Sequence, residues 1–277
     1  METMTALTAG PDGRPAPEEV PAPVAGPGEA LVAVRAISLN RGELLTLGRP
    51  GARPGWDVAG ELLQDAGDLA AGTRVVALVD GAGWADLVAV PLRRLAPVPD
   101  GLPLAQAAAL PVAGLTALRA IRMGGSLLGR RVLVTGERGS VGRLAVQLAA
   151  MSGARVGEGG PYDLVVELVG GATMARALGE LAPGGTLVSL AASDPEPVPY
   201  EPRTMFNAAP GARIVPWNVF DGTEPGGVRA DLELLLALVA AGRLRVELAA
   251  ERPWSEAAAA VDDLRARRVR GKVVLHR

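Results

Sequence analysis

The chain has 277 residues, 49% of them hydrophobic, a formal net charge of −2 at pH 7, no cysteine and one histidine, His276. This composition excludes disulfides, thiolate chemistry and Cys-ligated zinc, and it leaves almost no room for a His-based triad or a multi-His metal site. No apolar run approaches the ~18 residues of a membrane span, and no charged block or N-terminal leader pattern points to nucleic acid, an anionic membrane or export. We therefore expect a soluble cytoplasmic α/β protein without nucleic-acid or membrane partners.

The first part of the chain predicts a small β-barrel-like domain. Residues 1–28 are rich in Pro, Gly and Ala and are interpreted as an irregular edge segment. After them, short alternating segments with Gly and Pro between them recur at roughly 8–12-residue spacing, which is typical of such a domain. Strands are predicted at residues 29–38, 72–79 and 85–90, and residues 55–61 lead into a further strand. A short helix is predicted at 40–47.

The pattern changes near Leu104, where two helical pieces broken at Pro111 and Gly114 are predicted. From 131 to 241 strands and helices alternate, which favours a parallel doubly wound sheet. The predicted strands are 132–134, one beginning at 155, 162–169, 186–190 and 212–217, and the predicted helices are one after Gly142, 174–181 (stopped by Pro183-Gly184-Gly185) and 231–241. The remaining segments, 244–249, 255–267 and 272–275, are expected to fold back on the first domain. The predicted domains are therefore 1–112, completed by 243–277, and 113–242.

A glycine loop between a buried strand and a helix is the strongest chemical signal. Gly136, Gly139 and Gly142 are spaced G-x-x-G-x-x-G, after the apolar run 132–134 and before a helically periodic segment. Glycines let a backbone approach a pyrophosphate closely, and the following helix N-terminus offers unpaired N–H groups. The stretch predicts a dinucleotide site; a glycine-rich turn that only packs the helix on the strand is the alternative.

The order of short motifs along nearly the whole chain resembles the medium-chain dehydrogenase/reductases, in the zinc-independent quinone oxidoreductase and enoyl reductase branch. The carriers are Pro27-Gly28-Glu29, Ser38-Leu39-Asn40, Gly55 to Gly60, Gly72 to Val75, Ala107 to Pro111, Gly114 to Ala117, the glycine loop, Pro183 to Gly185 and Gly271 to Val274. The resemblance implies a GroES-like β-barrel domain and a Rossmann-like domain. It also implies a homodimer through the edge strand near Ile214, and hydride transfer from NADPH or NADH to an activated C=C or a quinone.

The resemblance also implies which residues bind the cofactor. They are Gly136, Gly139, Ser140, Val141 and Gly142 at the pyrophosphate, Thr116 with Asn40 at the nicotinamide half, Gly170 and Ala191 past strand ends, and Lys272. Helix capping by Thr116 and Asn40, and a solvated strand-end charge for Lys272, are the alternatives.

The catalytic candidates are Asn40, Tyr200 and Asp57. Tyr200 would donate a proton, or would only anchor its loop in a partly buried position. Asp57 would act as an acid or base if its pKa is raised, and is otherwise a structural residue hydrogen-bonded within its turn. The wider set of polar groups comprises Asn40, Glu43, Trp56, Asp57, Tyr200 and Asn218.

The sequence departs from the family in the nucleotide-binding domain. Only GEGGP separates Val156 from Tyr162, where relatives have a further helix and strand that form one wall of the adenine site. Glu158 remains, 22 residues after Gly136; an acidic residue there pairs with ribose hydroxyls and repels a 2′-phosphate, which favours NADH, or it is a solvated turn residue. Glu137 in the glycine loop would weaken pyrophosphate binding unless it points away or pairs with Arg138.

Three functions are consistent with these features. The first is a zinc-independent NAD(P)H-dependent reductase of an enone, enoyl or quinone substrate. The second is a family member that binds no cofactor and catalyses a non-redox step, such as cyclisation, elimination or isomerisation, in a biosynthetic pathway. The third is a non-catalytic binding protein.

Overall fold

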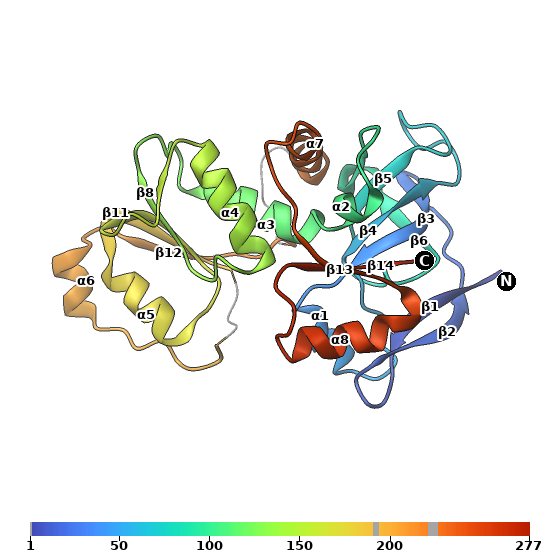
Figure 1. The fold of residues 1–277 in the computed structure, drawn as a ribbon, viewed down its shortest axis with the longest axis horizontal. Coiled ribbons are helices and arrows are strands. Elements are labelled where there is room, and N and C mark those ends of the chain that lie inside the picture. The colour runs from blue at the N-terminus through green and yellow to red at the C-terminus, as the bar shows by residue number, and fades with distance from the viewer. Residues whose placement is uncertain (1, 191–193, 221–226) are drawn as a thin grey trace. The chain divides into compact units, whose positions relative to one another are not determined.

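The structure, a computed structural model, describes residues 2–190, 194–220 and 227–277. The chain divides into two compact units, Met1–Leu115 with Gly222–Arg277, and Thr116–Asp221, called here the first and second unit (Figure 1). Helix α7 (Gly227–Ala240), which the sequence suggested for the nucleotide-binding domain, groups with the first unit. Its Arg229 donates two hydrogen bonds of 2.8 and 2.7 Å to the carboxylate of Asp68.

A seven-stranded mixed sheet forms the centre of the first unit. Its strand order is β13-β14-β3-β4-β5-β7, with β6 also paired to β3, and only β13 and β14 pair in parallel. The strands are β3 (Glu29–Ser38), β4 (Asp57–Leu62), β5 (Arg74–Leu78), β6 (Leu87–Pro91), β7 (Leu95–Pro97), β13 (Leu248–Pro253) and β14 (Lys272–His276). The helices are α1 (Glu43–Leu47), α2 (Leu104–Ala108), α7, α8 (Ala257–Arg265) and the short turns η1 (Leu92–Arg94) and η2 (Trp254–Glu256). The strands predicted for this part of the chain are confirmed.

The N-terminal segment corrects one prediction. Residues interpreted as irregular form a hairpin of β1 (Thr3–Ala9) and β2 (Pro15–Pro21), in register from Thr3↔Pro21 to Ala9↔Pro15. Prolines are tolerated there because β2 pairs with β1 alone and is therefore an edge strand. The high Pro content was therefore no evidence against a strand.

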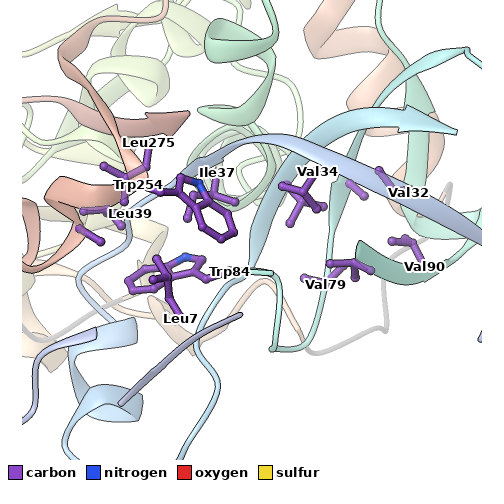
Figure 2. Packing of buried hydrophobic residues seen from close by; sticks show 14 of the residues in the cluster. Leu7, Val32, Val34, Ile37, Leu39, Val79, Trp84, Val90, Trp254 and Leu275 are labelled. Atoms are coloured by element: carbon purple, nitrogen blue, oxygen red, sulfur yellow. The ribbon is translucent and has the colours of Figure 1, made fainter. Parts of the chain in front are cut away.

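The core of the first unit joins segments that are distant in the sequence (Figure 2). Leu7 of β1, Ile37 of β3 and the indoles of Trp84 and Trp254 gather in one buried apolar cluster. Leu275 of β14 belongs to the same cluster, so the C-terminal segment contributes to the core of the first unit.

The second unit is built on a five-stranded sheet in the order β12-β11-β10-β8-β9, with every pair parallel. The predicted doubly wound sheet is thus confirmed. In chain order the elements are α3 (Pro111–Met123), which runs in from the first unit, β8 (Arg131–Val134), α4 (Ser140–Met151), β9 (Arg155–Val156), β10 (Tyr162–Glu167), α5 (Gly171–Gly179), β11 (Leu181–Ser189), α6 (Pro202–Ala208) and β12 (Arg213–Pro216). Pro183-Gly184-Gly185 lie inside β11 and do not separate a helix from a strand, because α5 already ends at Gly179.

The connection from β9 to β10 is unusually short. Residues 157–161 join the two strands without a helix, as the sequence indicated. α4 covers one face of the sheet, and α5 and α6 cover the other (Figure 1). β9 is added on one side of β8, and β10 and the later strands on the other. The carboxyl ends of β8 and β10 therefore form the switch point at which ligands bind in such sheets.

Candidate functional site

The glycine loop places an uncapped helix N-terminus at the switch point. Gly139 is the N-cap of α4, and no side chain caps this helix. The first i→i−4 bond of α4 runs from Arg143 N–H to Gly139 C=O, so the N–H groups of residues 140–142 have no partner within the helix. These three donors and the positive end of the helix dipole form an anion-binding site.

Close backbone packing explains the glycine at position 142. A Cβ atom there would lie 2.4 Å from the Gly136 carbonyl oxygen and 2.7 Å from the Cα of Glu137. Gly136 itself has φ +62°, which favours glycine. Glu137 and Arg138 are exposed, and no ion pair joins them in the part of the chain described.

A buried carboxylate lies beside this loop, and the sequence interpretation missed it. Glu167, at the end of β10, is fully buried and accepts hydrogen bonds from Thr135 Oγ1 (3.0 Å) and from the backbone N–H groups of Val169 and Gly170 (3.0 and 3.1 Å). Thr135 Oγ1 in turn accepts from Leu168 N–H at 2.8 Å. These bonds tie the segment after β10 to the segment after β8. Since parallel neighbours end at the same sheet edge, Thr135 and Glu167 could have been paired from the sequence.

A separate polar cluster lies in the first unit and is centred on a buried ion pair. Lys272, 3% exposed, donates from Nζ to Asp57 Oδ2 (2.8 Å), Asn40 Oδ1 (2.8 Å) and the Leu39 carbonyl (3.3 Å). An ammonium group has three donors, so this lysine is fully satisfied. The alternative of a solvated strand-end charge is therefore wrong.

Asp57 is held by four hydrogen bonds. Its Oδ2 accepts from Ser38 Oγ (2.5 Å), Asn40 Nδ2 (2.9 Å) and Lys272, and its Oδ1 accepts from Val112 N–H (2.8 Å). The last bond satisfies a free donor in the first turn of α3 and places a negative charge at its N-terminus. This carboxylate therefore accepts four hydrogen bonds, all from groups outside its own turn.

Asn40 is the member of the cluster with bonding capacity to spare. Its side chain donates one N–H to Asp57 and accepts one bond from Lys272, which leaves one N–H and one lone pair. The residue is half-buried, and it is not the N-cap of α1, which is Gly42. The buried ion pair therefore fixes the orientation of an amide that can still bind a ligand.

Glu43 binds the backbone on both sides of this cluster, at Asn40 and at Trp56. Its carboxylate accepts from the backbone N–H groups of Asn40 (2.6 Å) and Trp56 (2.8 Å) and is almost wholly buried. Burial, followed by the negative charge of Asp57, raises the pKa of Glu43 from its ordinary 4.5 to about 8, against the two N–H donors and Lys272, which lower it. This carboxyl group therefore titrates near neutral pH.

Replacing Glu43 by Gln should flatten the dependence of stability on pH. Between pH 4.5 and about 8 the folded chain keeps a proton that the unfolded chain has released, so the free energy of unfolding falls as pH rises through this window. The total fall amounts to a few kcal/mol, and it is absent from Glu43→Gln because an amide does not titrate. Urea midpoints measured from pH 5 to pH 8 test this. Glu18→Gln, at an exposed carboxylate of β2, should keep the wild-type slope, and an equally steep Glu43→Gln profile would refute the assignment.

The other predicted residues are placed as follows. Thr116 is buried inside α3 and caps no helix, and Gly170 is the N-cap of α5 with φ +90° and its N–H bonded to Glu167. Glu158 is exposed beyond β9. Tyr200 is 56% exposed in the second unit, so the partly buried anchor is not observed. Ala191 lies outside the described residues, and Asn218 is exposed and accepts a bond from Phe220 N–H at 2.9 Å.

Comparison with known proteins agrees with this fold. Residues 144–275 match the family described as zinc-binding dehydrogenase. The chain is 33% identical over 274 residues to the spectinabilin polyketide synthase system protein NorB of Streptomyces orinoci, and 33% identical over 159 residues to the chloroplastic quinone-oxidoreductase QR1 of Triphysaria versicolor. These alignments cover 83% and 50% of this chain but only 12% and 48% of the relatives. The quinone oxidoreductase structure from Coxiella burnetii has the same fold, with a TM-score of 0.83, 24% identity and full coverage of both chains.

A mixed sheet closed by the C-terminal strand, joined to a doubly wound sheet with a glycine loop at its switch point, defines a two-unit α/β protein of the dehydrogenase type. These matches support a quinone oxidoreductase-like protein of the medium-chain dehydrogenase/reductase superfamily.

The matched family description includes zinc, but the donor set does not fit that metal. Zinc sites use Cys, His and carboxylate ligands, and the chain has no cysteine. Its single histidine, His276, lies with Nε2 2.8 Å from Glu251 Oε2. Among the described residues no three His, Asp or Glu side chains are grouped to hold a metal ion.

Proposed function

We propose that the protein is an NAD(P)H-dependent oxidoreductase that reduces an activated C=C bond or a quinone without zinc. One observation carries the proposal: the uncapped N-terminus of α4 follows a tightly packed glycine loop at the switch point of the sheet. This arrangement fits a dinucleotide pyrophosphate, which would accept hydrogen bonds from the N–H groups of residues 140–142.

The chain's own residues bind and orient in this proposal, while the bound dinucleotide supplies the hydride. Reduction of an enone or quinone places negative charge on the substrate oxygen, and a preorganised N–H donor stabilises that charge. Asn40 supplies the donor, since one of its amide N–H groups remains available. Lys272 and Asp57 are positioning residues that hold the amide in one orientation, because Lys272 has no donor left for the substrate and Asp57 is fully buried.

The cofactor choice rests on Glu158. This exposed acidic side chain follows β9, in the position where acidic residues of dinucleotide folds bind ribose hydroxyls. Its negative charge disfavours a 2′-phosphate, so we propose NADH as the preferred cofactor, with NADPH the weaker one.

The substrate and the assembly are further parts of the proposal. The match to a polyketide synthase protein favours an enoyl substrate in a biosynthetic pathway. β12 is an edge strand with Ile214 45% exposed, which favours a homodimer by edge pairing. No helix among the described residues is both long and apolar enough for a bilayer, and a cytoplasmic location stays a prediction.

Steady-state kinetics test the function. Purified protein should oxidise NADH, and more slowly NADPH, only when a naphthoquinone, cyclohexenone or crotonyl thioester is present. Asn40→Ala should lower kcat with at least one acceptor by tenfold or more, because a donor to the developing oxyanion is lost. Conversion of an acceptor without any dinucleotide would instead support the non-redox enzyme, and absence of both cofactor binding and conversion would support a binding protein.

A further inference from the structure

A cavity of about 420 Å³ lies entirely within the first unit, apart from the glycine loop. It is bounded by α1, the turn that follows it and the end of β5, and its lining includes Thr46, Arg49, Arg53, Trp56 and Asp80. This volume falls in the range of small-molecule sites.

The charges of the lining are not balanced by the protein. Asp80 is paired with Arg94, so its carboxylate is already engaged. In the described part of the chain, Arg49 and Arg53 have no acidic partner, and the buried Nε of Arg53 has no hydrogen-bond partner. Buried donors are almost always paired, so an enclosed guanidinium nitrogen without an acceptor calls for an explanation.

Packing fixes the shape of the site beside these cations. The Trp56 indole lines the cavity and is also held against Gly42, where a Cβ atom would lie 2.5 Å from the indole ring. Thr46 adds a hydroxyl group to the lining. Two guanidinium groups and a hydroxyl beside an aromatic ring suit an oxyanion carried on a planar or apolar body.

We propose that this cavity binds a small ligand through a carboxylate or phosphate group, with Arg53 and Arg49 as the anion-binding residues and Trp56 as the surface for the ligand's apolar part. The site can be tested apart from the hydride-transfer proposal, because its lining contains neither Asn40, Asp57 and Lys272 nor the glycine loop.

Calorimetric titrations of the full chain with benzoate, phenyl phosphate and neutral benzamide, at constant ionic strength, test the site. At least one of the two anions should bind saturably with one site per chain, and benzamide should bind at least tenfold more weakly. Which anion binds decides between a carboxylate and a phosphate ligand.

Substitutions localise the binding. Arg53→Gln should weaken the bound anion at least tenfold, whereas Arg93→Gln, at an exposed arginine outside the cavity, should change its affinity less than twofold. Arg49→Gln is a second variant, and its substitution should not affect folding because Arg49 is exposed. It should also weaken binding of the anion. Saturable binding of neither anion, equal binding of benzamide, or equal losses in Arg53→Gln and Arg93→Gln would overturn the proposal.

Discussion

Lys272→Met should destabilise the first unit by about 3–5 kcal/mol, because it leaves the buried carboxylate of Asp57 without its counter-charge. The pair is almost fully enclosed, with side-chain exposures of 3% for Lys272 and 0% for Asp57, and water cannot replace the lost ammonium group. The same change removes the bond that orients Asn40. Three of the four tryptophans, Trp56, Trp84 and Trp254, belong to the first unit, so urea unfolding followed by indole fluorescence reports on it.

The matched control is an ion pair of the same sheet that remains open to solvent. Arg35 and Glu61 are paired at 3.0 Å with exposures of 53% and 41%, so Arg35→Met should cost no more than about 1 kcal/mol. The double variant Asp57→Asn with Lys272→Met should recover part of the loss, since it removes both charges. Equal effects of Lys272→Met and Arg35→Met would contradict the buried ion pair.

Gly142→Ala should abolish most dinucleotide binding. The added Cβ would meet three backbone atoms of residues 136 and 137 at 2.4 to 2.9 Å, and no flexible side chain can yield to relieve the contact. The loop must therefore move away from the N-terminus of α4, with overpacking costs of about 1–3 kcal/mol. Calorimetry with NADH should show at least a tenfold weaker affinity, while circular dichroism should still show a folded chain.

The neighbouring glycine provides the control for that variant. At Gly139 the nearest atom to an added Cβ is the Gly136 carbonyl oxygen at 3.3 Å, and the backbone has φ −80°, which alanine adopts freely. Gly139→Ala should therefore change NADH affinity less than threefold. Similar losses in both variants, or none in Gly142→Ala, would show that the loop does not bind the cofactor as proposed.

The second unit was the more predictable part of the fold. Its strands are buried on both faces and are therefore nearly continuous apolar runs, as in β10, and its helices carry regular apolar spacing, as in α4. The prediction failed where Pro and Gly were taken as breaks, in β2 and at residues 183–185 of β11. In both places the chain tolerates these residues within a strand, and only the pairing of whole strands reveals this.

The candidate site was predictable only in part. The motifs indicated Asn40, Asp57 and Lys272 individually, but a contact between residues 215 positions apart has no local signal in the sequence. Burial could not be anticipated either, and it is burial that changes Lys272 from a surface charge into a partner of Asp57 and raises the pKa of Glu43. The arginine-lined cavity depends on a turn between α1 and β4 whose path no periodicity describes.

Hydride transfer from a labelled cofactor tests the central claim most directly. NADH that carries deuterium in the transferable position is incubated with the protein and cyclohexenone or crotonyl thioester, and the product is analysed by mass spectrometry and NMR. The account predicts one deuterium per product molecule, on the carbon β to the carbonyl group, with Gly142→Ala strongly reduced in rate. A product that forms without deuterium, or that forms equally well in the absence of NADH, would contradict it.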